Sequence, residues 1–176
     1  MIKIIKKLTM LAFSISLAGC STAIKVYEKE TPKLVLENYF NGHMTANGLV
    51  MNRSGQVMRR FKVQLNTVWK ENTGTLAENF LWNNGEKTQR VWTIKKLSDG
   101  NYEGSASDIL GVAVGEQAGN AFHWTYKMDL PVDKTSYRVH FSDWMYLTDE
   151  KVLINRAQIS WFGIHAGEVL IFFIKE

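Results

Sequence analysis

Apolar and polar residues alternate with a period of two over much of the chain. On one face of the segment 57–69, five of seven residues are apolar, whereas the intervening positions hold two apolar residues in six. The same alternation occurs over 121–130 and 137–147, where Asp143 is the one acid on an apolar face. This pattern is typical of antiparallel strands with one buried face.

Turn signals separate these segments at regular spacing. They are Arg53-Ser54-Gly55, Asn72-Thr73-Gly74, Asn83-Asn84-Gly85, Ser98-Asp99-Gly100, 131–134 and 148–150. We therefore predict an all-β fold over 34–176, an up-and-down antiparallel barrel of about eight to ten strands, because closure removes exposed sheet edges. A barrel of about eight strands has room for one small ligand. Thr31-Pro32 predicts a short N-terminal helix over 34–40.

Two turns predict the register of three neighbouring strands. If the loop of the hairpin is Asn83-Asn84-Gly85, Leu76 lies opposite Trp92 and Glu78 lies opposite Arg90. The same argument at 98–100 places Trp92 opposite Ala106 and Arg90 opposite Asp108. Glu78, Arg90 and Asp108 then share one otherwise apolar face, where charges have to be paired.

Two interpretations of these charges stay open. They form either a buried ion network that fixes strand register or a network that partly meets the polar head of a ligand inside the barrel. Arg59 and Asp143 are weaker candidates of the same kind, and a strand end in contact with water is the alternative place for each. The predicted cavity wall consists of aromatic residues on inward faces, namely Phe61, Phe80, Trp92, Trp124, Tyr126 and Phe141.

The N-terminal 19 residues have the pattern of a signal peptide. Three lysines precede an apolar run over 8–17, which is about half the roughly twenty residues that a membrane-spanning helix needs. Leu17-Ala18-Gly19-Cys20 resembles the lipobox of bacterial lipoproteins. The resemblance implies cleavage before Cys20, diacylglycerol on its thiol and an acyl chain such as palmitate on the new amine.

Further expectations about the N-terminus follow from this resemblance. Cys20 is the only cysteine, so a disulfide within the chain is excluded. Ser21 stands where an aspartate would resemble an inner-membrane retention signal, which favours the periplasmic face of the bacterial outer membrane. Residues 20–33 are polar and of mixed charge, and we expect them to form a lipidated tether.

Charge and motifs exclude several classes of function. The formal net charge is +4, but the first 19 residues contain three lysines and no acid, so the remainder is close to neutral and gives no sign of nucleic-acid binding. The sequence has no G-x-S-x-G, phosphate-loop or H-E-x-x-H motif, so we expect no catalytic residue, no metal and no cofactor. Glycines at 111, 115 and 119 predict a flexible connection or a lid over the barrel mouth.

Several longer stretches resemble a known family. They are "NRSGQVMRRF", "GTLAENFLWNNGEKTQRVW", "GEQAGNAFHWTY", "DWMYLTDEKVLINRA" and "FGIHAGEV". They are similar to those of a bacterial family of predicted lipoproteins that is defined as a domain of unknown function. The resemblance implies a lipocalin-like outline, and its gene neighbourhoods with fatty-acyl-modifying enzymes imply a lipid.

These observations favour a binding protein. We expect an outer-membrane lipoprotein whose barrel binds or carries an apolar, acyl-bearing molecule in the periplasm, such as a fatty acid or phospholipid. One alternative is a structural or assembly partner in the envelope, with a filled interior and an apolar patch in which the segment 169–176 takes part. A second alternative is a lipid-modifying enzyme, for which a cleft with an acid–base pair of perturbed pKa would be the sign. Protein partners are not predicted.

Overall fold

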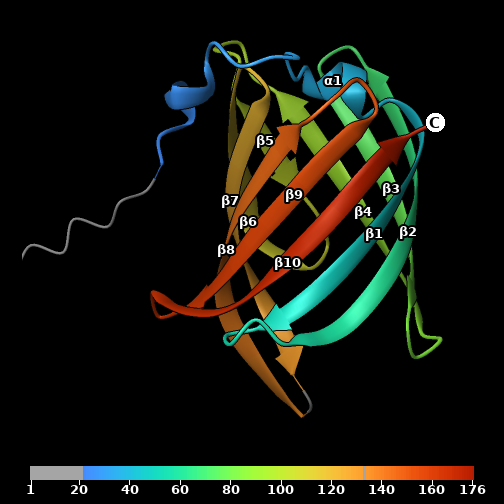
Figure 1. Ribbon diagram of the computed structural model, residues 1–176, viewed down its shortest axis with the longest axis vertical. Helices are drawn as coiled ribbons and strands as arrows, with labels where there is room; N and C mark the ends of the chain where they lie inside the picture. The colour runs from blue at the N-terminus through green and yellow to red at the C-terminus, as the bar shows by residue number, and fades with distance from the viewer. Residues whose placement is uncertain (1–21, 133) are drawn as a thin grey trace, which may run out of the picture.

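The computed structural model describes residues 22–132 and 134–176, which form a closed antiparallel barrel (Figure 1). Its strand order is β1-β10-β9-β8-β7-β6-β5-β4-β3-β2, so each strand pairs with its neighbours in sequence and β1 closes on β10. The predicted up-and-down barrel is confirmed. The ten strands of the described residues are β1 (Gly42–Asn52), β2 (Val57–Lys70), β3 (Thr73–Trp82), β4 (Lys87–Lys96), β5 (Tyr102–Ser105), β6 (Ile109–Ala118), β7 (Ala121–Val132), β8 (Thr135–Leu147), β9 (Val152–Trp161) and β10 (Ile164–Lys175).

The period-two pattern of the sequence becomes the inside and outside of the barrel. In β2, Phe61, Val63 and Leu65 are at most 5% exposed, whereas the residues between them are exposed. Successive side chains of a strand point to opposite faces, so the inward rows of all strands meet in one core. Burial of each large apolar side chain contributes about 1.5–3 kcal/mol.

The predicted register of the β3–β4 hairpin is confirmed. Leu76 pairs with Trp92 and Glu78 pairs with Arg90. The loop has three residues, because the Trp82 N–H donates to the Glu86 carbonyl at 2.9 Å and Gly85 has φ of 85°. Glycine is favoured there because a left-handed residue completes this turn.

The register predicted between β4 and β5 is confirmed over the length of their ladder. Thr93 pairs with Ser105 and Ile94 with Gly104, which is the alignment that places Trp92 opposite Ala106 and Arg90 opposite Asp108. The ladder ends at Thr93 and Ser105, so these last two pairs lie beyond it. The chain reverses after β5 in a turn with a hydrogen bond from the Ile109 N–H to the Ala106 carbonyl, and β6 then pairs with β7.

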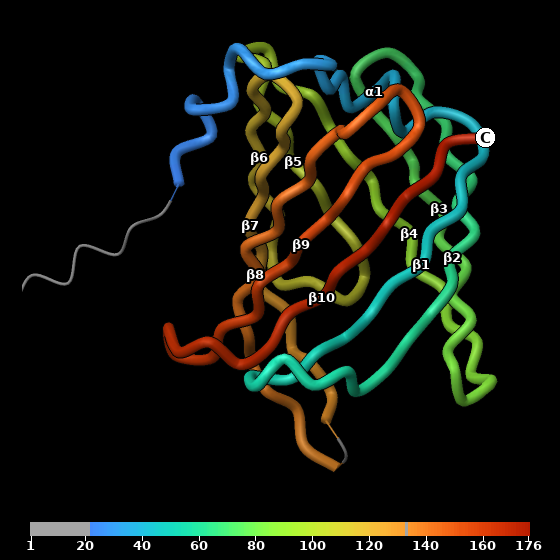
Figure 2. The backbone as a smooth tube through the Cα atoms, viewed as in Figure 1, coloured from blue at the N-terminus to red at the C-terminus, as the bar shows by residue number. Residues whose placement is uncertain are grey.

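One end of the barrel is covered by the segment 34–40 (Figure 2). Leu34, Leu36 and Phe40 are at most 3% exposed and join the core. The helix α1 (Leu36–Tyr39) is shorter than the predicted one and begins four residues after Pro32. The reason is that the Leu34 N–H donates to the Gly119 carbonyl at 2.8 Å, which holds the preceding backbone on the barrel.

Residues 24–27 lie against the outside of the barrel. They form the short 3₁₀ helix η1 (Ile24–Tyr27), in which Ile24 is buried and Tyr27 meets the rings of Trp144 and Tyr146 edge-on. Within the segment expected to be a tether, Ile24 is therefore buried against the barrel, whereas most of residues 25–33 are exposed. Cys20 and the signal peptide lie outside the described residues.

The predicted lid at 111–119 is wrong, because most of this stretch belongs to β6. Gly115 faces the interior, where a Cβ atom would lie 2.5 Å from Cζ of Phe122. The glycine thus makes room for an aromatic ring of the neighbouring strand. The regular spacing of Gly115 and Gly119 therefore reflects core packing at the first and a turn at the second.

We predict that Gly119→Ala detaches the N-terminal segment. Its Cβ would lie 1.7 Å from the Tyr27 carbonyl oxygen, so residues 22–33 have to move. Gly55→Ala is the matched control, since Gly55 also has positive φ but no atom within 4 Å of the new Cβ. Both variants bear the left-handed strain of about 1–2 kcal/mol. Limited proteolysis should cleave 22–33 faster in Gly119→Ala alone; equal cleavage in both variants contradicts the packing role.

Candidate functional site

The hairpins β1–β2, β3–β4, β7–β8 and β9–β10 turn at the end of the barrel opposite α1 (Figure 1). Near this end, several apolar side chains that face the interior are only partly buried. Other inward-facing side chains of the same strands are buried in the core. We call the partly buried ones the open half. They are Val50, Phe80, Trp82, Leu130, Val169 and Ile171. Water therefore reaches apolar side chains that face inward in this half.

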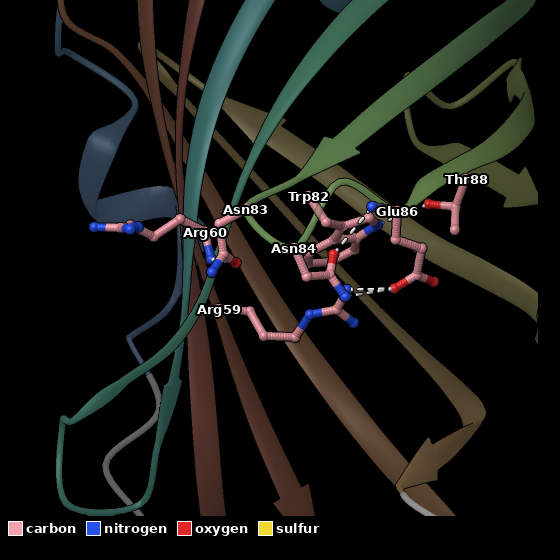
Figure 3. A network of polar contacts seen from close by, with 7 residues as sticks. All are labelled: Arg59, Arg60, Trp82, Asn83, Asn84, Glu86 and Thr88. Carbon is pink, nitrogen blue, oxygen red and sulfur yellow. Dashed lines mark hydrogen bonds and ion pairs between the residues drawn. The ribbon is translucent and has the colours of Figure 1, made fainter.

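Arg59 lies at the rim of the open half (Figure 3). Its guanidinium carbon is 3.8 Å from the centroid of the Trp82 ring, and its Nη2 lies 2.7 Å from Oε2 of Glu86. The two charged side chains are 39% and 47% exposed, so water screens their attraction. Of the two places that the sequence left open for Arg59, the structure shows the one at a strand end in contact with water.

Hydrogen bonds hold the β3–β4 turn at this rim (Figure 3). The Arg60 N–H donates to Oδ1 of Asn83 at 3.0 Å, and the Asn83 N–H donates to the Arg60 carbonyl at 2.9 Å. The indole N–H of Trp82 donates to Oγ1 of Thr88 at 2.9 Å. The ring under Arg59 is thus held in place by a hydrogen bond from its own indole.

Arg90 and Asp108 form an ion pair deeper in the barrel wall. Nε of Arg90 donates to both carboxylate oxygens, at 3.1 and 2.9 Å, and its guanidinium lies 5.1 Å from the Trp92 ring. The pair links β4 to the turn after β5, beyond the last ladder position of β4 and β5. The predicted contact between Arg90 and Asp108 is confirmed. Their side chains make it, because the backbone ladder of β4 and β5 has already ended.

Glu78 is the third member of the predicted network, and the structure leaves it unpaired. It lies opposite Arg90, yet among the described residues the guanidinium of Arg90 pairs with Asp108 and not with Glu78. Oε2 of Glu78 is buried and has no hydrogen-bond partner. Burial raises the pKa of Glu78 to about 7; the charge of Arg90 lowers it, and those of Asp108 and Asp143 raise it further.

Asp143 is buried and fully hydrogen-bonded. The indole N–H of Trp124 donates to Oδ2 at 3.0 Å, and Nδ2 of Asn155 donates to Oδ1. Burial raises the pKa of Asp143 to about 6, against the lowering effect of these bonds and of Arg90. The sequence reasoning did not select Asn155, although its place between Leu153 and Ala157 on an inward row was a signal.

All six residues of the predicted cavity wall face inward. Phe61 contacts Phe80 and Trp82 with ring centroids 5.5 and 5.0 Å apart. Trp92 lies 4.6 Å from Trp124 and 5.5 Å from Tyr126, which stacks on Phe141 at 4.8 Å. Phe80 and Trp82 belong to the open half, whereas Trp92, Trp124, Tyr126 and Phe141 are buried and pack on one another.

Sequence reasoning missed a second polar cluster, at the covered end. Tyr102 donates its hydroxyl to Oε2 of Glu37 at 2.8 Å, and Lys96 pairs with the same carboxylate. Burial acts to raise the pKa of Glu37, but the hydrogen bond from Lys96 leads the effects that lower it overall. Lys96 continues the inward row of Trp92 and Ile94, whereas no periodicity marks Glu37.

Two hollows of about 530 and 520 Å³ lie on the outer side of the barrel, over β1, β2 and β3. Leu49, Leu81 and Phe172 contribute to the first, and Lys62 lines both. Phe172 and Ile174 are 42% and 44% exposed, while Phe173 between them is buried. The last strand is therefore apolar on both faces, as the sequence indicates.

Two further findings concern the part of the chain that the structure describes. In residues 22–132 and 134–176, no three His, Cys, Asp or Glu side chains are grouped so that they could hold a metal ion. No helix in these ranges is long and apolar enough to cross a membrane.

We predict that Glu78 makes the protein less stable as the pH rises. Its pKa in the folded state, about 7, exceeds the ordinary value of 4.5, so the folded state binds the extra proton between these values. The resulting stability is complete below pH 4.5 and is lost as the pH rises through 7, by about 3 kcal/mol. Glu78→Gln should remove this loss in denaturant unfolding measured from pH 4 to 8.

Asp143→Asn provides the comparison for this prediction. The pKa of Asp143 is raised from 3.8 to about 6, so this variant should remove pH dependence only in that lower window. Loss of the dependence between pH 6 and 7 in Asp143→Asn, with its retention in Glu78→Gln, would contradict the assignment to Glu78.

Comparison with known proteins gives a family without an established activity. No curated protein matches the chain. A family model described as "Protein of unknown function (DUF3833)" matches residues 14–175, which is nearly the whole sequence. The resemblance seen in the sequence is thereby confirmed as membership of a family, and the chain belongs to the DUF3833 proteins of unknown function.

Proposed function

We propose that this protein is a lipid-anchored protein of the bacterial outer membrane whose barrel binds an acyl-bearing amphiphile in the periplasm. The apolar chain of the ligand lies among the side chains of the open half, and its anionic head lies at Arg59. Cys20 carries the anchoring lipid. The partial exposure of the inward-facing apolar side chains is the observation that supports this function, because such side chains are ordinarily buried in a barrel interior.

The charges at the open end fit an anionic head. Arg59 is paired only with an exposed carboxylate, and a carboxylate or phosphate of the ligand can replace Glu86 without leaving a buried charge unpaired. Arg90 is less suited, since Asp108 already occupies its guanidinium and links two parts of the wall. The ring contacts of Trp92, Trp124 and Tyr126 limit how far a chain extends into the barrel.

A second candidate is a structural or assembly partner in the envelope that binds no ligand. The outer hollows over β1 to β3 favour it, because Leu49, Leu81 and Phe172 form an apolar surface outside the barrel. The aromatic packing in the middle of the barrel also agrees with this candidate. Absence of lipid from the purified protein, together with loss of a co-purifying envelope protein in Leu81→Ser, would favour it.

A lipid-modifying enzyme is the less favoured alternative. Glu78 and Asp143 have raised pKa values of the kind that general acid–base catalysis uses. Both oxygens of Asp143, however, already accept hydrogen bonds from Trp124 and Asn155, and Oε2 of Glu78 is shielded from water. These two acids therefore serve better as buried structural groups.

The ligand proposal predicts bound lipid in the purified protein. Every strand and the covering segment lie within 22–176, so a chain without residues 1–20 keeps the contacts described here. Purified without detergent, it should release fatty acid or phospholipid on solvent extraction. Arg59→Ala should retain about tenfold less, since a charge-assisted hydrogen bond contributes about 1.5–3 kcal/mol.

Arg138→Ala is the matched control for this experiment. Arg138 pairs with Asp129 at 2.9 Å, as Arg59 pairs with Glu86, but on an exposed outer surface. This variant should retain as much lipid as the wild type. Equal loss in both arginine variants argues against a head at Arg59, and an empty protein that binds no acyl probe argues against the ligand itself.

The anchor proposal predicts processing at Cys20. The full chain expressed in a bacterium should have a mass that corresponds to residues 20–176 plus diacylglycerol and one acyl chain. Cys20→Ser should leave the precursor uncleaved, whereas Ser21→Ala should be processed as the wild type. Intact-mass analysis decides this, and a mature chain with an unmodified thiol would rule the anchor out.

A further inference from the structure

The β9–β10 hairpin ends in a cluster of exposed apolar side chains. Trp161, Phe162 and Ile164 are 44%, 87% and 60% exposed, and Tyr137 beside them is 39% exposed. We call these four residues the hairpin tip. Exposed apolar side chains that stand alone are ordinary, but several large ones together mark an interaction surface. Residues 160–165 also contain no acid.

The backbone of the turn does not explain Phe162. Trp161 pairs with Ile164, so the loop consists of Phe162 and Gly163, with φ of 47° and 77°. Positive φ at both central positions is the signature of a type I′ turn, for which Asn-Gly is the preferred sequence. A bulky residue in this region is strained. Phe162 is thus unfavourable for the turn and contributes almost no burial to the fold.

Aromatic contacts hold the hairpin tip in place. The Trp161 ring meets Tyr137 edge-on at 5.8 Å and Phe162 at 4.9 Å. Side chains that are already fixed lose little conformational entropy when they enter an apolar phase. The hairpin tip is therefore an apolar surface whose aromatic side chains are already packed together.

The tip and the beginning of the described chain project in the same direction. In Figure 1, the hairpin between β9 and β10 and the segment before η1 are the two described parts that extend furthest to the left of the barrel. A plane at that side touches both, whatever their depth in the view. Cys20 precedes Thr22 by two residues, a reach of about 7 Å when extended. A lipid on Cys20 therefore places the bilayer on the side from which the tip projects.

We propose that the hairpin tip inserts into the surface of the same bilayer that holds the N-terminal lipid. Tryptophan and tyrosine are enriched at membrane interfaces, because their rings are apolar and their N–H or O–H groups meet water. Phe162 and Ile164 supply the apolar side chains that enter the acyl region. The barrel then has two contacts with the membrane, at residue 20 and at the tip. This inference rests on the proposed anchor at Cys20.

Fluorescence quenching tests this contact. The full chain is reconstituted in vesicles of phosphatidylethanolamine and phosphatidylglycerol that contain a phospholipid brominated near the top of its acyl chains. Bromine quenches tryptophan on contact, so the wild type should be quenched and Trp161→Phe should lose most of that quenching. Trp69→Phe is the matched control, because Trp69 lies at the covered end and donates its indole N–H to the Phe40 carbonyl at 2.6 Å; this variant should be quenched as the wild type.

Phe162→Asn separates the contact from the fold. Asparagine suits the type I′ turn, so the thermal midpoint should be unchanged or higher, while the quenching of Trp161 should fall. Equal quenching in the wild type and Trp161→Phe would overturn the proposal. So would a change of oligomeric size in Phe162→Asn without a change in quenching, which would assign the tip to a protein contact.

The mass of the N-terminal peptide distinguishes failure of the anchor from failure of the tip. An acylated Cys20 without quenching of Trp161 retains the anchor and overturns the inserted tip. Quenching of Trp161 in a chain without acyl groups supports the tip and rejects the anchor. Absence of both acylation and quenching rejects both.

Discussion

Backbone pairing between β1 and β10 is the interaction on which the rest of the structure depends. It runs from Met44 opposite Lys175 to Asn52 opposite Gly167 and joins the first strand to the last. Without it both strands would present free edges, and the inward rows would have no enclosed space to fill. Closure fixes which face of every strand points inward, and therefore which side chains meet.

The short strand β5 is the exception in this closed wall, and the polar chemistry of the interior gathers around it. Because the ladder with β4 ends at Thr93, the Arg90–Asp108 pair connects β4 with the turn that follows β5. The guanidinium of Arg90 therefore pairs with Asp108, and Glu78 has no ion-pair partner among the described residues. A buried carboxyl group without a partner is costly to ionise, which is why burial raises the pKa of Glu78 to about 7.

The two ends of the barrel differ, and this difference gives the fold its proposed use. At one end, Leu34, Leu36 and Phe40 continue the core, and Glu37 joins the covering helix to Lys96 and Tyr102. At the other end, apolar side chains that face inward remain in contact with water, and Arg59 lies over Trp82 at the rim. In the proposed function, a chain-shaped ligand therefore enters from this second end, because residues 34–40 cover the first.

The sequence by itself determined the features that depend on neighbouring residues. Alternation placed Phe61, Trp92 and Phe141 inside, and the glycines at 85 and 100 set two hairpin loops, because strand faces and tight turns follow local rules. The same rules brought Glu78 opposite Arg90 and placed Asp143 among apolar residues.

Only the tertiary structure decided which of several candidate partners each group meets. In the folded chain Arg90 forms an ion pair with Asp108, and Asp143 accepts hydrogen bonds from Trp124 and Asn155. Among the described residues, Oε2 of Glu78 has no hydrogen-bond partner. The tertiary structure also packed η1 and the segment 34–40 on the barrel, although neither has a periodicity from which a packing site could be predicted. Such contacts depend on distances between segments remote in the chain, which are fixed only when the barrel closes.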